Sequence, residues 1–142
     1  MRLIGGGLLF FILVPFVQAQ EKTKWQRIAT YEDSIVSLDI SNVTFSTSFS
    51  GRVRFRLELA KSEPVSKGQT LKYRSLIQTI DFICEERKYR VFETLMFDSK
   101  GKPLDVEKPA PETQWQSVRA GGIMEQWLVA ACRLIAEKKG NS

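Results

Sequence analysis

Phe82-Ile83-Cys84 ends the longest strand-like segment of the chain, and the last amphipathic segment contains the only other cysteine, Cys132. Residues 71–84 are rich in Ile, Thr, Tyr and Phe, which favour β-strands. Residues 123–138 place their apolar side chains in one broad helical stripe. If the two thiols are joined, a late strand and the last helix are tied together covalently. The pattern therefore predicts a fold organised around the contact between this strand and this helix.

The N-terminus has the pattern of an export signal. Arg2 precedes an apolar run from Leu3 to Val17, and Val17-Gln18-Ala19 places small residues at the positions that a signal peptidase reads. The run is shorter than the roughly 20 residues of a membrane-spanning helix, which favours a cleaved signal peptide at 1–19 over an uncleaved anchor. The cleavage site lacks the cysteine of a bacterial lipoprotein. We therefore expect a protein of the periplasm, the cell surface or the extracellular space, with no transmembrane segment after signal cleavage.

Export favours a disulfide between the two cysteines, because disulfides form in oxidising compartments. A disulfide would close a loop of about 49 residues and stabilise the fold by roughly 4 kcal/mol on the chain-entropy model. Two buried free thiols are the alternative that the residues leave open. Neither cysteine belongs to a C-x-x-C motif, so the sequence gives no local support for redox catalysis.

The rest of the chain predicts one domain of the α+β class. We divide the chain into a signal peptide (1–19), a short polar lead-in (20–23), a single domain (24–138) and a tail (139–142). Strands are expected at 25–30, 34–40, 52–59, 71–84, 89–97 and, as a short edge strand, 104–106, with a flexible loop at 61–70. Because the strands come first and a helix comes last, we expect an antiparallel β-sheet of about five or six strands with the C-terminal α-helix packed on one face.

The clearest strand pattern lies at residues 52–59, where charged and apolar side chains alternate strictly. This period of two predicts one buried face and one solvated face. Basic residues alternate in the same way at the start of the segment 71–84. If the two strands pair, their cations could form a patch suited to sulfated glycans, anionic lipid or an acidic protein surface. The patch would contain Arg52, Arg54, Arg56, Lys72 and Arg74, and an ordinary solvated sheet face is the alternative.

The composition argues against catalysis, because the chain contains no histidine. Histidine is the commonest general base and a frequent zinc ligand. Asp81 and Glu93 lie on strands that are expected to pair, but solvation or an ion pair with Lys or Arg is the favoured role of each. A hydrolase that uses carboxylates alone is the remaining enzymatic alternative, and it requires two acids facing each other in a deep cleft. We expect no catalytic residue, no metal site and no cofactor.

The charge and the aromatic residues limit the partners further. The formal net charge of +5 is spread along the chain, so we expect no nucleic-acid partner. Trp25, Trp115 and Trp127 lie within apolar patterns. We expect these three tryptophans in the core rather than in a ligand platform.

Several segments of the chain carry a family resemblance when they are taken together. They are Trp25-Gln26-Arg27-Ile28, Ser37-Leu38-Asp39-Ile40-Ser41, Val53-Arg54-Phe55-Arg56, Tyr73-Arg74-Ser75, Asp81 to Arg90, Trp115-Gln116-Ser117-Val118 and Ala131-Cys132. In this order they resemble the surface-adhesin protein E-like domain of exported bacterial proteins. The resemblance covers about residues 24–133, and the segment from Asp81 to Arg90 followed by the second cysteine is its most specific part.

The resemblance implies an antiparallel sheet backed by a C-terminal helix, with a disulfide between Cys84 and Cys132. It also implies adhesion to host or matrix proteins. We therefore expect an exported, non-enzymatic binding module of the bacterial envelope or cell surface, whose partner is a protein or an anionic polymer. The alternative is a periplasmic structural or accessory protein of an envelope assembly with no host ligand. A homodimer formed through a sheet edge or face is a further expectation.

Overall fold

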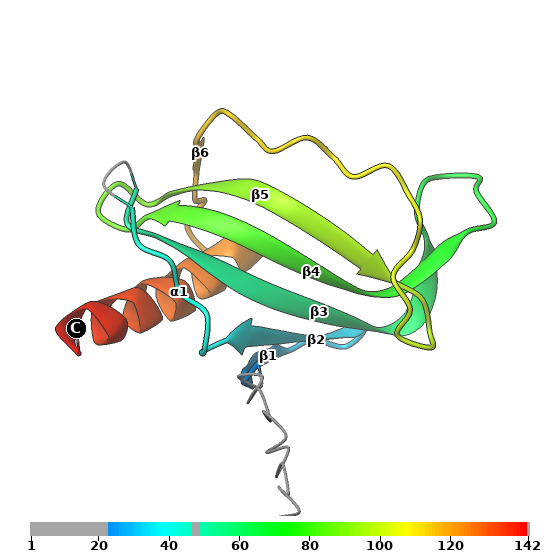
Figure 1. Ribbon diagram of the computed structural model, residues 1–142, viewed down its shortest axis with the longest axis horizontal. Coiled ribbons are helices and arrows are strands. Elements are labelled where there is room, and N and C mark those ends of the chain that lie inside the picture. The colour runs from blue at the N-terminus through cyan, green and yellow to red at the C-terminus, as the bar shows by residue number, and fades with distance from the viewer. Residues whose placement is uncertain (1–22, 47–48, 142) are drawn as a thin grey trace, which may run out of the picture.

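The computed structural model describes residues 23–46 and 49–141 (Figure 1). The expected signal peptide at 1–19 lies outside this part of the chain. The described residues form one six-stranded sheet and one helix. The elements are β1 (Trp25–Thr30), β2 (Ser34–Asp39), β3 (Gly51–Pro64), β4 (Lys72–Ile83), β5 (Lys88–Phe97), β6 (Gln116–Ser117) and α1 (Ile123–Gly140). The predicted α+β class, antiparallel sheet and C-terminal helix are confirmed.

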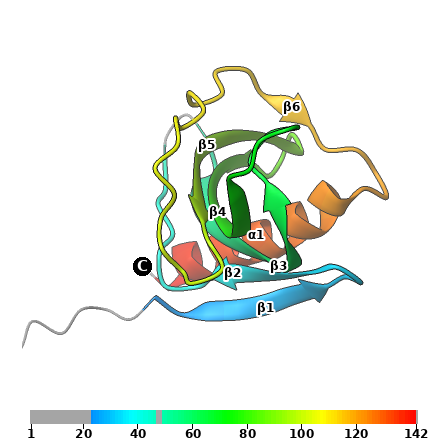
Figure 2. The same ribbon diagram turned by 90° about the vertical axis from the view of Figure 1, so that its right-hand side faces the viewer.

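The sheet is a meander in which each strand pairs antiparallel with the next strand in the chain. Tight turns join β1 to β2 and β4 to β5. The turn between β1 and β2 closes with a hydrogen bond from the Tyr31 backbone N–H to the Ser34 carbonyl, 2.8 Å long. The turn between β4 and β5 places Arg87 in the left-handed region, with φ of 54°. Figure 2 shows that the strands curl strongly from β1 to β5, as expected from the twist of antiparallel strands.

The hydrophobic core lies between one face of the sheet and α1. Phe55 of β3 stacks on Trp127 of α1 with ring centroids 4.8 Å apart, so the expectation of a buried tryptophan is confirmed at Trp127. The helix approaches β3 closely at Gly51, where an added Cβ would lie 2.9 Å from the side chain of Ile135. The core residues are Val36, Leu38, Val53, Phe55, Ile80, Phe82, Trp127, Leu128, Ala131, Leu134 and Ile135.

The disulfide between Cys84 and Cys132 is present, and the alternative of two free thiols is wrong. Cys84 follows β4 directly, and Cys132 lies in the middle of α1. The two Cα atoms are 5.8 Å apart. The bond therefore fastens the helix to the end of the central hairpin of β4 and β5.

Several predicted strand boundaries differ from the structure by one residue, and three differ by more or affect a loop or the helix. β3 runs to Pro64 rather than ending at Leu59, because Glu63 and Pro64 pair with the start of β4 after an irregularity in the ladder. The predicted flexible loop at 61–70 is therefore shorter at its N-terminal side. The helix continues to Gly140 instead of ending at Lys138.

The short edge strand predicted at 104–106 is also wrong. After β5 the chain makes only an isolated bridge between Phe97 and Pro103 and then runs back beside β5 (Figure 1). Prolines at 109 and 111 interrupt any ladder in this segment because they lack the N–H donor. The sixth strand is instead Gln116–Ser117, which pairs with Lys88 and Tyr89. Within the described residues, no helix is long and apolar enough to cross a membrane.

Candidate functional site

The sheet face turned away from α1 carries the charged residues of β3. Directly opposite residues of an antiparallel pair have their side chains on the same face. Arg52 lies opposite Asp81 of β4, and Asp81 lies opposite Arg90 of β5. The register therefore aligns a carboxylate between two arginines across three neighbouring strands.

Asp81 is the centre of this group. Its side chain is almost completely buried and accepts hydrogen bonds from Arg52 Nε at 2.7 Å and Arg90 Nε at 3.1 Å. Arg52 also donates through Nη2 to the second carboxylate oxygen at 3.3 Å. A buried carboxylate is costly unless it is paired and hydrogen-bonded. The arrangement satisfies Asp81 and fixes both guanidinium groups at the surface of the sheet.

Aromatic rings support the same two arginines. The guanidinium carbon of Arg52 lies 3.5 Å from the ring centroid of Phe92, and that of Arg90 lies 4.3 Å from the ring centroid of Trp115. Phe49 lies within cation–π range of both guanidinium groups, at 5.6 Å and 5.8 Å. The three rings come from the connection before β3, from β5 and from the segment before β6. Residues far apart in sequence therefore hold the arginines in place.

An irregularity in β5 explains the position of Phe92. The ladder pairs Thr79 with Glu93 and Ile80 with Val91, so Phe92 is an extra residue in β5. A β-bulge of this kind changes the direction of a side chain relative to regular alternation. Here the Phe92 ring lies over Arg52 and remains 37% exposed.

A second buried aspartate lies further across the same face. Asp39 of β2 accepts hydrogen bonds from the Ser41 backbone N–H at 3.0 Å and from the Asn42 side-chain amide at 2.9 Å. Arg54 Nη1 approaches the Asp39 carboxylate at 3.4 Å. Trp25 of β1 lies over the guanidinium group of Arg56 at 4.7 Å. The pairing of acid, arginine and aromatic ring is thus repeated at a second position.

These residues form one continuous feature, which we call the arginine–aromatic surface. It lies over the buried carboxylates of Asp39 and Asp81. Its members are Trp25, Phe49, Arg52, Arg54, Arg56, Arg90, Phe92 and Trp115.

The structure divides the predicted basic patch. Arg52, Arg54 and Arg56 lie together, opposite Asp81, Thr79 and Ile77 respectively. Lys72 and Arg74 alternate with Tyr73 and Ser75, and Ser75 lies opposite Glu58, so both cations project from the other side of β4. Arg74 donates from Nε to the Leu59 carbonyl at 2.6 Å. The five cations therefore do not share a face.

The expectation of buried tryptophans is wrong for Trp25 and Trp115. Both rings are half-buried against arginines and lie outside the core cluster. Sequence reasoning also missed Phe49, Arg90 and Phe92. Alternation along β5 could have placed Arg90 on one face, but nothing in the sequence indicates the bulge at Phe92 or the return of Trp115 over the sheet.

The two acids on the paired strands β4 and β5 do not face each other. Asp81 is engaged by two arginines, and Glu93 lies opposite Thr79, one row away. In the ranges 23–46 and 49–141, no group of His, Cys, Asp and Glu is arranged to hold a metal ion. The chemistry that this surface offers is recognition by guanidinium groups and aromatic rings.

The architecture defines the class of this protein as a small α+β domain with a six-stranded meander and a disulfide-tethered C-terminal helix. A family model described as surface-adhesin protein E matches residues 25–133. The chain belongs to the surface-adhesin protein E family, which confirms the resemblance found in its sequence. No curated protein matches the chain.

One solved structure shows the same fold, and a second also matches. The structure of Haemophilus influenzae protein E matches with a TM-score of 0.55 at 15% sequence identity, over 80% of this chain and 86% of that chain. A crystal structure of protein E from non-typeable Haemophilus influenzae matches with a TM-score of 0.47 at 15% identity, over 82% and 89% of the two chains. At this identity, the first of these matches supports the fold alone.

Proposed function

We propose that this protein is an exported, non-enzymatic binding module that contacts an acidic surface of a partner protein, such as a host or matrix protein. The contact would be made by the arginine–aromatic surface. Membership of the surface-adhesin protein E family supports a binding role. The observation that carries the proposal is the set of four arginines held on one sheet face by two buried aspartates and by aromatic rings.

The residue types of this surface are those that contribute most to protein interfaces. Arginine, tryptophan and other aromatic residues are enriched at interface centres, and a few of them supply most of the binding energy. The side chains of Arg52, Arg54 and Arg56 are 28%, 33% and 31% exposed. About a third of each side chain therefore remains accessible to a partner although part of its guanidinium group is engaged.

Preorganisation adds to this argument. A long side chain that is ordered only on binding loses rotamer freedom, which costs about 0.5–1.5 kcal/mol. The carboxylate of Asp81 and the ring of Phe92 already restrict Arg52, and Trp25 already restricts Arg56. A partner that offers carboxylates would therefore meet donors that are largely fixed in position.

The test compares two pairs of charge-removing substitutions. Arg54→Gln/Arg56→Gln removes two cations from the arginine–aromatic surface, and Lys72→Gln/Arg74→Gln removes two cations from the other side of β4. Binding is measured by biolayer interferometry against immobilised matrix proteins and against heparin, after near-UV circular dichroism shows that both variants are folded. We expect at least a tenfold loss for the first pair and less than a twofold change for the second.

Equal effects of the two pairs would contradict the proposal, because they would reduce the role of the surface to net charge. Binding to heparin but to no protein would replace the protein partner with an anionic polymer. Protease digestion of intact cells tests the location separately. Protection of the chain in intact cells, together with no binding to any matrix protein, would favour the periplasmic accessory role instead.

A further inference from the structure

A groove separates β1 from α1 on the core side of the sheet. The helix packs mainly on β3 and β4, to which the disulfide also fastens it. Two hollows lie between the helix and the first strands, with volumes of about 380 Å³ and 560 Å³. They share Gln26, Ile28, Ala130 and Arg133, so they form one continuous depression, which we call the β1–α1 groove.

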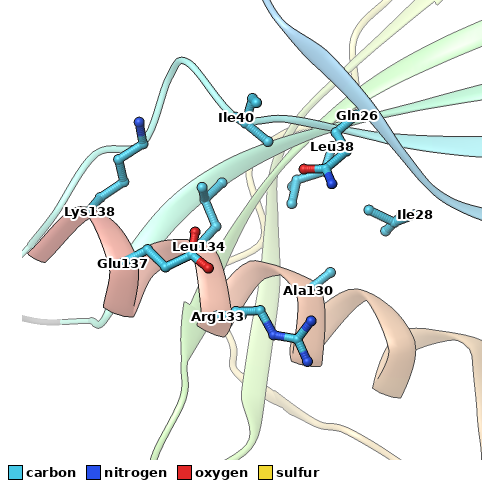
Figure 3. A pocket seen from close by; sticks show the side chains of 9 residues that line it. All are labelled: Gln26, Ile28, Leu38, Ile40, Ala130, Arg133, Leu134, Glu137 and Lys138. Atoms are coloured by element: carbon cyan, nitrogen blue, oxygen red, sulfur yellow. The ribbon is translucent and has the colours of Figure 1, made fainter. Parts of the chain in front are cut away.

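The walls of this groove combine polar and apolar side chains, and the apolar ones form a strip between the sheet and the helix. Figure 3 shows Ile28, Leu38 and Ile40 of the sheet side facing Ala130 and Leu134 of the helix. Val129 of α1 extends the apolar wall into the second hollow and is 48% exposed. Small-molecule sites usually have volumes of about 300–1,000 Å³. Each hollow falls within this range, and together they form an elongated site.

The charges at the rim are unequal. Arg133 borders both hollows, while Lys138 borders the first and Arg27 borders the second. Within the described residues, Arg133 has no carboxylate within ion-pair distance. The acidic residues of the rim are Glu137 and Glu125.

Glu125 is already engaged by Gly121, which also lines the second hollow, and by Arg87. Its Oε2 accepts a hydrogen bond from the Gly121 backbone N–H at 2.7 Å and lies 3.6 Å from Arg87 Nη2. The rim therefore carries two acids, Glu125 and Glu137, and three cations. An apolar strip beside an arginine that has no acidic partner among the described residues is complementary to an apolar chain with an anionic head.

We propose that the β1–α1 groove binds a single-chain anionic amphiphile, specifically a long-chain fatty acid. The hydrocarbon lies against Ile28, Leu38 and Leu134, and the carboxylate meets the guanidinium group of Arg133. Arginine and carboxylate form bidentate, charge-assisted hydrogen bonds, which suits a head group of this type. This site lies on the opposite side of the sheet from the arginine–aromatic surface, so it does not depend on the protein-binding role proposed above.

Isothermal titration calorimetry with hexadecanoate, below the concentration at which it aggregates, tests the site. Hexadecyltrimethylammonium, which has the same chain and the opposite charge, is the matched probe. We expect saturable binding of hexadecanoate at one site per chain and at least tenfold weaker binding of the cation. Absence of hexadecanoate binding to the unmodified protein would overturn the proposal.

Three variants locate the binding. Ala130→Trp fills the part common to both hollows and should abolish binding, while Arg133→Glu should weaken hexadecanoate at least tenfold and strengthen the cation. Lys72→Glu makes the same charge change outside the groove and should alter the affinity less than twofold. Because Arg133 is at the rim, its variant keeps the test decisive if Ala130→Trp does not fold. Equal losses in Arg133→Glu and Lys72→Glu would refute the assignment.

A last control separates this site from the other face of the sheet. Arg54→Gln/Arg56→Gln should bind hexadecanoate like the unmodified protein. Loss of hexadecanoate binding in that variant, with binding retained in Arg133→Glu, would move the fatty acid to the arginine–aromatic surface and overturn the groove site. Loss of matrix-protein binding with hexadecanoate binding intact would leave the groove proposal standing.

Discussion

Removal of the disulfide should cost this domain a large part of its stability. The bond joins residues that are 48 positions apart. In the chain-entropy model, closing a loop of this length in the unfolded state stabilises the fold by roughly 4 kcal/mol. Domains of this size have total stabilities of about 5–15 kcal/mol. We therefore expect Cys84→Ser/Cys132→Ser to remain folded at 25 °C with a much lower midpoint of urea unfolding.

The size of the shift follows from the urea dependence. With a slope of about 1–3 kcal/mol per M, a loss of roughly 4 kcal/mol lowers the midpoint by about 2 M. Unfolding is followed by far-UV circular dichroism for the oxidised protein, for the protein reduced in place and for the double variant. The last two should agree, because both lack the same constraint and keep the same packing between β4 and α1.

A loss below about 1 kcal/mol would refute this reasoning, because it would mean that the tether hardly restricts the unfolded chain. A normal loss in the double variant with no loss after reduction would point to packing of the substituted side chains instead. A change in slope between the three samples would show that the unfolded states differ in compactness, and the comparison would then be made by hydrogen exchange at α1.

Two further substitutions and one titration test the packing and the electrostatics. Asp81→Asn leaves two half-buried arginines without their carboxylate and should lower the free energy of unfolding by about 3–5 kcal/mol in urea titrations; a loss under about 1 kcal/mol would contradict the buried pair. Gly51→Ala places a methyl group 2.9 Å from the Ile135 side chain and should cost about 1–3 kcal/mol, with partial recovery on adding Ile135→Val. The backbone N–H of Lys102, with that of Lys100, holds the pKa of Asp98 below its ordinary value. The turn is therefore stabilised at pH values above the pKa that Asp98 has in the unfolded chain. This stability is lost as the pH falls through the lower pKa that Asp98 has in the folded protein. An NMR titration of Asp98 that gives an unshifted pKa would contradict this assignment.

The sequence alone determined the class of the fold and its main contacts. Strict alternation at 52–59 predicted β3, the apolar stripe at 123–138 predicted α1, and the family resemblance implied the disulfide between Cys84 and Cys132. The strand and helix patterns are local in the chain, so one sequence is enough to reveal them, whereas the disulfide was implied by the family resemblance and not by a local pattern. The same local pattern placed Arg52, Arg54 and Arg56 on one face of β3, because side chains alternate along a strand with a period of two.

Only the tertiary structure decided which residues complete the surface and which leave it. Alternation describes one strand at a time, whereas the register between strands decides that Arg90 lies beside Asp81 and that Arg74 projects elsewhere. The bulge that directs Phe92 over Arg52 depends on pairing between two strands, so it has no signal in either strand alone. Trp115 reaches the same group because the chain returns along β5 before β6. The physical reason is that side-chain preference is a property of a short segment, while a binding surface is built from the register and crossing of segments far apart in the chain.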